Sequence, residues 1–149
     1  MDKRRVVITG MGLLSPIGNS VTSFHDGLKL GKNGIGPITL FNTDEFSVKI
    51  AGEVKGLDFE DHIERRQINR MDRFCLFAVI AADQAVQQSG LNSNGVDKKR
   101  IGVIIGSGIG GMDTLTHNHS RLLKSPRRVS PLFIPMMISD IAPGHVSIK

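Results

Sequence analysis

The sequence predicts an α/β fold, in which helices cover a sheet of buried strands. Residues 101–105 (IGVII) form a short apolar run with β-branched side chains at four of its five positions. Such a run suits a strand that is buried on both faces. Four glycines occur in residues 106–111, and a segment that can be helical follows over 112–123. A strand, a glycine turn and a helix in succession are typical of a site at the carboxyl edge of an α/β sheet.

The N-terminal part of the chain predicts a second strand and a first helix. Residues 5–14 combine an apolar run at 6–8 with later glycines, which indicates a buried strand that runs into a turn. Asn19 or Ser20 can cap a helix over 21–30, because their side chains accept hydrogen bonds from the free N–H groups of a first helical turn. Both predicted strands run into glycines, but this parallel is too short to establish an internal repeat.

Residues 72–89 predict the best-defined helix of the chain, and Gly90 ends it. Apolar residues recur on one continuous face, and its alanines permit a close approach to a sheet or another helix. Other apolar residues cover much of the remaining surface, so the helix is expected to be central and buried. Cys75 has no histidine or lysine within a turn to lower its pKa, which indicates an inert core thiol. The continuous face consists of Phe74, Phe77, Ala78, Ala81, Ala82 and Ala85, and the other apolar residues are Leu76, Val79, Ile80 and Val86.

Basic residues gather in two stretches of the sequence. In residues 64–73, the spacing of Arg66, Arg70 and Arg73 predicts three guanidinium groups on one helical face, with an ordinary solvated face as the alternative. Residues 126–131 (PRRVSP) predict a second basic loop.

Composition limits the classes of function. A chain of 149 residues is expected to form one domain, here 1–149. A net charge of +5 favours an acidic partner, and the absence of tryptophan and tyrosine leaves little for stacking on nucleic-acid bases. The single cysteine excludes an internal disulfide and fits a reducing compartment, and nothing approaches the ~20 apolar residues of a membrane span. We therefore expect a cytoplasmic protein with no membrane or nucleic-acid partner. His117 and His119 lie on different sides of a helix, so no shared metal site is expected.

A dinucleotide site is one interpretation of the glycine turn. Gly106, Gly108 and Gly111 satisfy the G-x-G-x-x-G pattern, which places a pyrophosphate on a helix N-terminus. That pattern also needs an acidic residue about 20 positions later to hold the ribose. The only acid after residue 114 is Asp140, in a segment broken by prolines. A tight turn that lines some other pocket is therefore favoured over a dinucleotide-binding oxidoreductase.

A series of motifs resembles one enzyme family in order and in spacing. The motifs are residues 5–19 (RVVITGMGLLSPIGN), 34–36 (GIG), 51–54 (AGEV), 70–74 (RMDRF), 105–111 (IGSGIGG), 126–131 (PRRVSP) and 144–145 (GH). Together they resemble the elongating β-ketoacyl-acyl-carrier-protein synthases, and synthase II most closely. The resemblance implies a thiolase-like fold of two similar halves, with layered α/β/α structure, a mixed sheet and assembly as a homodimer. This chain resembles the N-terminal half, incomplete and ending before the nucleophile turn.

The resemblance also implies a reaction. Such synthases carry out decarboxylative Claisen condensation without a cofactor: a cysteine thiolate takes the acyl group, and two histidines promote loss of CO2 from malonyl-carrier. Cys75 does not match the family's nucleophile, and neither do His117, His119 or His145 match its catalytic pair. No catalytic residue is therefore assigned among these residues. The catalytic cysteine and both histidines are expected beyond Lys149, and the chain alone is expected to be inactive.

Substrate-handling residues do carry over by resemblance. Ile109, beside Gly108, matches the position that gates the acyl pocket, and Phe133 matches an aromatic that reaches this pocket across the dimer interface. Core packing is the alternative role for Phe133. The basic sites that meet the acidic acyl carrier protein correspond to Arg66, Arg70, Arg127 and Arg128. Asn69 stands where some relatives carry a base. A non-catalytic chain-length partner of a polyketide synthase remains a second interpretation.

Overall fold

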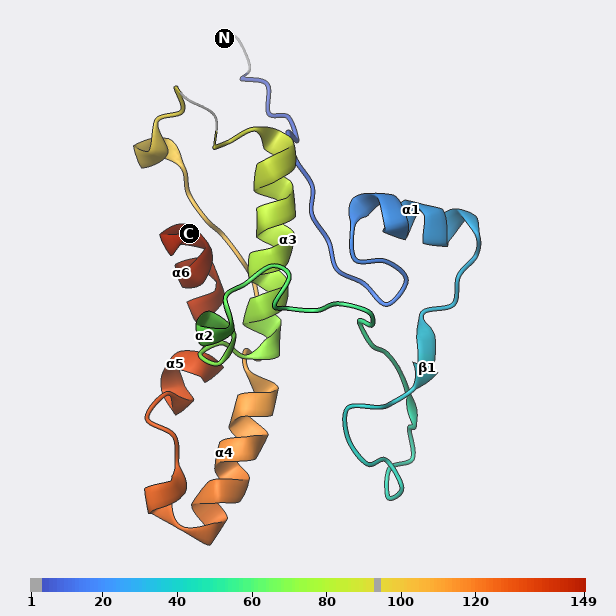
Figure 1. The fold of residues 1–149 in the computed structure, drawn as a ribbon, viewed down its shortest axis with the longest axis vertical. Helices are drawn as coiled ribbons and strands as arrows, with labels where there is room; N and C mark the ends of the chain where they lie inside the picture. Colours follow the sequence, from blue (N-terminus) through green and yellow to red (C-terminus); the bar gives the residue numbers. More distant parts are fainter. Residues whose placement is uncertain (1–3, 93–94) are drawn as a thin grey trace.

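The computed structural model describes residues 4–92 and 95–149 of the chain. The long helix over 73–89 is central, with the helix over 141–148 beside it and the helix over 112–124 further along the long axis (Figure 1). The helix over 21–29 and a small sheet lie to one side of this helical body (Figure 1). The elements are α1 (Val21–Lys29), β1 (Ile35–Pro37), β2 (Ile50–Gly52), α2 (Arg65–Ile68), α3 (Arg73–Ser89), the 3-10 helix η1 (Lys98–Arg100), α4 (Met112–Lys124), the 3-10 helix η2 (Pro126–Arg128), α5 (Phe133–Met137) and α6 (Ile141–Ile148).

The layered sheet expected from the sequence is not formed within the described residues. Their only sheet has two antiparallel strands, β1 and β2. The predicted strands at 5–14 and 101–105 are wrong for this structure, since both segments lack strand pairing. Val6 and Ile104 are 95% and 98% exposed instead of buried. The physical reason is that a strand needs a neighbour to accept and donate its backbone hydrogen bonds, and no described segment provides one.

Helix α3 confirms the prediction of a central helix. Its N-cap is Asp72, whose side chain accepts a hydrogen bond from the backbone N–H of Phe74, and it ends at Gly90 in the left-handed conformation at φ 68°. Helix α6 packs against it, and the methyl group of Ala142 is fully buried there. The most buried residues of α3 are Cys75, Leu76, Val79 and Ile80, whereas the expected face of phenylalanines and alanines is only half-buried.

The extended N-terminal segment lies directly against the alanines of α3. Met11 donates its backbone N–H to Gln88 Oε1 at 2.6 Å, and Leu13 donates to Gln84 Oε1 at 3.2 Å. A Cβ atom at Gly10 would overlap the carbonyl oxygen of Ala85, and one at Gly12 would overlap that of Ala81. Glycine is therefore required at both positions because the two backbones approach so closely.

Helix α1 and the small sheet form a lateral arm with its own polar contacts. Ser20 caps α1 as predicted, in a reciprocal capping box with Ser23. Glu53 is buried beside the sheet and accepts hydrogen bonds from the backbone N–H and the hydroxyl of Thr39, at 2.8 and 2.7 Å. These bonds lower the pKa of Glu53 below its ordinary value of 4.5, and the bond from the Thr39 hydroxyl has the largest effect. The Glu53 carboxylate thus fixes the chain after β1, at Thr39, against the end of β2.

The three arginines predicted on one helical face do not share a helix. Helix α2 ends at Ile68, and α3 begins only at Arg73, so Arg66 and Arg73 lie on different helices and Arg70 lies between them. Arg73 points inward: its guanidinium lies 5.0 Å from the ring centroid of Phe77 and donates to the carbonyl oxygen of Val54 at 3.2 Å. The prediction failed because the backbone breaks where Asp72 starts a new helix.

Candidate functional site

The glycine turn is built by contacts with two other elements. Gly111 is the N-cap of α4, and its backbone N–H donates to the carbonyl oxygen of Met137, at the end of α5, at 2.8 Å. Because glycine has no side chain to cap the helix, Asp72 does so from α3: its Oδ2 accepts the N–H of Thr114 at 2.9 Å. A Cβ at Gly111 would lie 2.8 Å from that same oxygen. Asp72 therefore fixes the start of two helices at once.

Ile109 and Gly108 lie at the open side of this turn. Ile109 is 68% exposed, and a Cβ at Gly108 would meet nothing within 4 Å. Phe133 is the first residue of α5 and is half-buried. The hydrogen bond from Gly111 to Met137 brings the turn next to the other end of α5. The structure thus joins the two segments that carry the predicted pocket residues, and their roles in an acyl pocket stay predictions.

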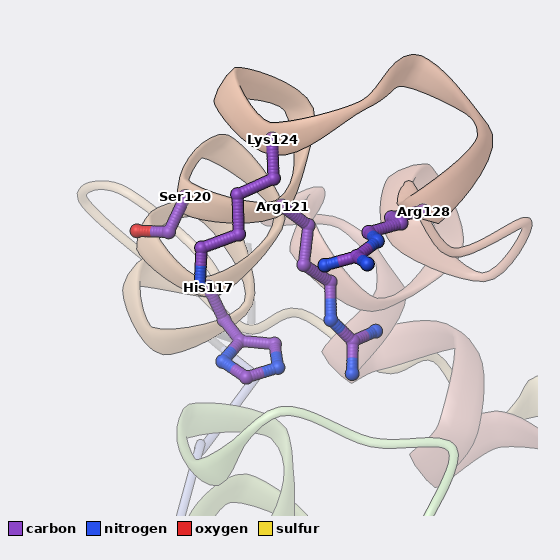
Figure 2. Close-up of a pocket in the computed structure, with 5 residues that line it drawn as sticks. All are labelled: His117, Ser120, Arg121, Lys124 and Arg128. Carbon is purple, nitrogen blue, oxygen red and sulfur yellow. The ribbon is translucent and has the colours of Figure 1, made fainter.

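A basic hollow of about 520 Å³ lies between α4 and η2. Figure 2 shows three basic side chains of α4, with the Arg128 side chain reaching toward Arg121 from the loop that follows. Its lining residues are His117, Ser120, Arg121, Lys124 and Arg128, and no carboxylate is among these described residues. Because its lining carries basic side chains and no carboxylate, the hollow favours an anionic group.

Buried polar groups hold the basic loop against α4. Asn118 is 5% exposed; its Nδ2 donates to the carbonyl oxygen of Thr114, and its Oδ1 accepts the backbone N–H of Ser130, both at 2.9 Å. Ser130 follows η2 closely, so this bond ties the end of the basic loop to the helix. Within the loop, the N–H of Arg128 donates to the carbonyl oxygen of Ser125 at 3.0 Å.

The four arginines predicted to dock a carrier lie in two separate places. Arg66 and Arg70 lie on α2 and the turn after it, beside the middle of the molecule, whereas Arg127 and Arg128 lie on η2 beyond the far end of α4 (Figure 1). All four are exposed. The structure therefore does not bring the two pairs into one patch.

Two members of the basic hollow were not predicted from the sequence. Arg121 and Lys124 join Arg128 there, and His117 completes the group. Residues 117, 121 and 124 follow the spacing i, i+4 and i+7, which places them on one face of a helix. That spacing was present in the sequence and could have revealed the group.

Cys75 is confirmed as an inert core thiol. Its side chain is fully buried in the hydrophobic core. Burial, and to a smaller extent the charge of Asp72, raise the pKa of the Cys75 thiol to about 11. The thiolate that a nucleophile needs is therefore almost absent at neutral pH. Across residues 4–92 and 95–149, no three histidine, cysteine or acidic side chains gather as metal ligands, and no helix is long and apolar enough to cross a membrane.

Lys149, beyond which the catalytic cysteine and histidines are expected, is the C-cap of α6. Its ammonium group forms an ion pair with Asp83 of α3, with Nζ and Oδ1 3.2 Å apart. Lys149 thus adds a polar contact to the packing of α6 on α3. Nothing in these 149 residues tests the expectation of a catalytic set beyond Lys149, which stays a prediction.

Comparison with known proteins decides the family. A model described as "Beta-ketoacyl synthase, N-terminal domain" matches residues 3–149. The chain belongs to the β-ketoacyl synthase family. This β-ketoacyl synthase segment is 54% identical over 149 residues to 3-oxoacyl-[acyl-carrier-protein] synthase 2 of Staphylococcus aureus (strain N315), covering 99% of the chain and 36% of that relative. It is 45% identical over 150 residues to the enzyme of the same name from Synechocystis sp. (strain ATCC 27184 / PCC 6803 / Kazusa), again covering 36% of the relative and all of the chain.

Solved structures agree on the fold of this β-ketoacyl synthase segment. The ishigamide ketosynthase/chain length factor matches with a TM-score of 0.83 at 26% identity, over 99% of this chain and 37% of that one. A β-ketoacyl synthase from Burkholderia phymatum STM815 matches with a TM-score of 0.79 at 24% identity, over 98% of this chain and 36% of that one. The segment therefore has the fold of the N-terminal region of ketosynthases and spans about a third of the length of the relatives it matches.

Proposed function

We propose that this chain is the acyl-binding and carrier-docking part of a 3-oxoacyl-[acyl-carrier-protein] synthase of fatty acid elongation. The 54% identity to the staphylococcal relative supports this assignment. In this proposal the complete protein carries out decarboxylative Claisen condensation between an acyl-enzyme and malonyl-carrier, as a cytoplasmic homodimer. In the same proposal the nucleophile and both histidines come from residues beyond Lys149. Cys75 is buried and protonated, so it does not serve as the nucleophile.

The basic hollow is the observation that carries the docking part of the proposal. Three of its side chains are the basic residues Arg121, Lys124 and Arg128, and they face solvent on an exposed loop and helix face. An acidic carrier protein is attracted to such a surface over a distance of about 8 to 10 Å at ordinary ionic strength. Arg127 adds a further exposed guanidinium to the same loop. One solved type II ketosynthase that shares this fold is in complex with its acyl-carrier protein.

Charge reversal tests this docking surface. In the full-length protein, replacing Arg127 and Arg128 with glutamate should raise the apparent KM for acyl-carrier and change its dependence on salt, while the KM for a small thioester stays unchanged. Reversal of Lys98 and Lys99 to glutamate is the matched control, because it makes the same charge change on the other exposed 3-10 helix. If both substrates suffer alike, or if the control has the same effect, the loop is not a docking surface.

The acyl-pocket role of Ile109 has a separate test. Ile109 presents a large aliphatic side chain at the open side of a turn built otherwise from glycine and serine. We expect Ile109→Phe to narrow the pocket, so that the loss of kcat/KM grows with the length of the acyl primer. Overpacking of such a site typically costs about 1–3 kcal/mol. Equal losses for short and long primers would show that Ile109 does not line the pocket.

A chain-length partner of a polyketide synthase is the second candidate function. It is compatible with the TM-score of 0.83 to a solved structure whose name includes both a ketosynthase and a chain length factor. Acyl transfer to the full-length protein, followed by condensation with malonyl-carrier, distinguishes the candidates, because a non-catalytic partner lacks the nucleophile. These 149 residues expressed alone should show no turnover in either case. The dinucleotide hypothesis finds no support in the family match, and a titration with nicotinamide cofactor would reveal it.

A further inference from the structure

Asn118 is one of four buried polar residues in the described part of the chain. It is 5% exposed on a helix whose neighbouring residues His117 and His119 are both exposed. Both ends of its amide are used, one within α4 and one on the backbone of Ser130, twelve residues later. A buried amide with both groups satisfied specifies one arrangement of the segments that it joins.

The bond to Ser130 lies at a junction between two functional segments. On one side stands η2 with its two arginines. On the other side Ser130 starts the approach to α5, because its Oγ accepts the N–H of Leu132 at 3.1 Å and its carbonyl oxygen accepts the N–H of Phe133 at 3.0 Å. A contact at this single residue therefore sets the position of both segments relative to α4.

The hydrogen bond between Asn118 and Ser130 acts against electrostatic repulsion in the basic hollow. Arg121 and Lys124 are fixed on α4, while Arg128 belongs to a short loop element. Like charges at close range repel, and the repulsion favours movement of the loop away from the helix when no anion is bound. Asn118 holds the loop in place with a neutral acceptor, so it adds no negative charge to the hollow.

We propose that Asn118 is a positioning residue for carrier docking, which keeps Arg128 beside Arg121 and Lys124 before the carrier arrives. This inference rests on the docking function proposed above. A surface held in its binding arrangement loses less conformational freedom on association, and this gain is seen in the affinity for the carrier. Asn118 itself needs no contact with the carrier, since it acts through the backbone of Ser130 and thereby through Arg128.

A double-mutant cycle in the full-length protein tests this proposal. Asn118→Ser keeps a hydroxyl that can donate to the carbonyl oxygen of Thr114, and it removes the acceptor for Ser130. Losing one such hydrogen bond should raise the ratio of KM for acyl-carrier to KM for a small thioester about three- to tenfold. In an Arg128→Gln background, the same substitution should change this ratio less than about twofold, because coupled residues are non-additive.

The controls separate a positioning role from a general loss of stability. Val79→Ala removes buried core volume far from the loop, so it should lower the melting temperature without changing the ratio of the two KM values. An equal effect of Asn118→Ser in both backgrounds, or no effect on the ratio, would overturn the proposal. If Arg128→Gln alone leaves the ratio unchanged, the docking function fails, and the role of Asn118 fails with it.

A measurement on the unchanged protein keeps the proposal testable if Asn118→Ser does not fold. The backbone N–H of Ser130 points at a buried acceptor, so its hydrogen exchange should be as slow as that of amides in the middle of α4. Exchange of this amide should also stay slow in the absence of carrier. An amide of Ser130 that exchanges as fast as an exposed loop amide would contradict a loop held in place in advance.

Discussion

Helix α3 and residues 101–105 are similarly apolar, yet their side chains differ in burial. Leu76 in α3 is 5% exposed, whereas Ile104 is 98% exposed. The helix forms its hydrogen bonds internally and is covered by α6 and by apolar residues of the loop before α2. The extended segment has no strand partner among the described residues, and only Ile105 packs against the core, so Ile104 is left exposed. An apolar sequence therefore shows that a segment can be buried, but its side chains are buried only where another segment packs against them.

Truncation of one side chain in each region should give the largest difference. Leu76→Ala removes a buried side chain and should lower the free energy of unfolding by about 2–5 kcal/mol. Ile104→Ala changes an exposed side chain and should alter it by less than about 0.5 kcal/mol. Urea unfolding of both variants provides the measurement. Similar losses would show that residues 101–105 are covered by a segment or a copy outside the described contacts.

Substitutions at Gly12 and Gly102 extend the comparison of packed and exposed segments to the backbone. Gly12→Ala should force the N-terminal segment away from the carbonyl oxygen of Ala81 in α3, at a cost of about 1–3 kcal/mol in the free energy of unfolding. Gly102→Ala places its methyl group in open space and should be neutral or slightly stabilising, because alanine restricts the unfolded chain. Thermal unfolding of the two variants checks this, and equal shifts in Tm would contradict the close packing at Gly12.

The lateral arm should respond to acid pH through Glu53. The pKa of Glu53 is lowered in the folded state, so its stabilising contribution is fully present above the ordinary value of 4.5 and is lost as the pH falls through the lowered pKa. Glu53→Gln should therefore reduce the free energy of unfolding modestly at neutral pH, and the difference from the unchanged protein should shrink below pH 4.5. A difference that is constant across acidic pH would exclude this role for the carboxylate.

Helices α1 and α3 were predictable because their determinants are local. Ser20 and Gly90 mark helix ends through their own backbone and side-chain chemistry, as the sequence predicted. Asp72, predicted as the first residue of the long helix, is its N-cap. The strands were not predictable in the same way, since pairing depends on distant segments. The apolar run at 101–105 has the composition of a buried strand without a described partner.

The candidate site was predicted in its parts but not in its arrangement. The sequence pointed to the glycine turn and to the basic loop, and the structure contains both. It gave no indication that Asp72 caps α4 from another helix or that Asn118 ties Ser130 to it, because such contacts join residues far apart in the chain. The helical face with Arg121 and Lys124 was accessible from spacing alone.

Chemical labelling of the buried Cys75 thiol can report the opening of the hydrophobic core. Cys75 is the single cysteine in the sequence, it is fully covered, and its pKa of about 11 suppresses the reactive form. Alkylating reagents should therefore modify it only in molecules whose core has separated, at a rate set by how often α3 and α6 part. The kinetics of covalent labelling then give the opening equilibrium of the core directly, without an introduced dye, an added residue or a denaturant.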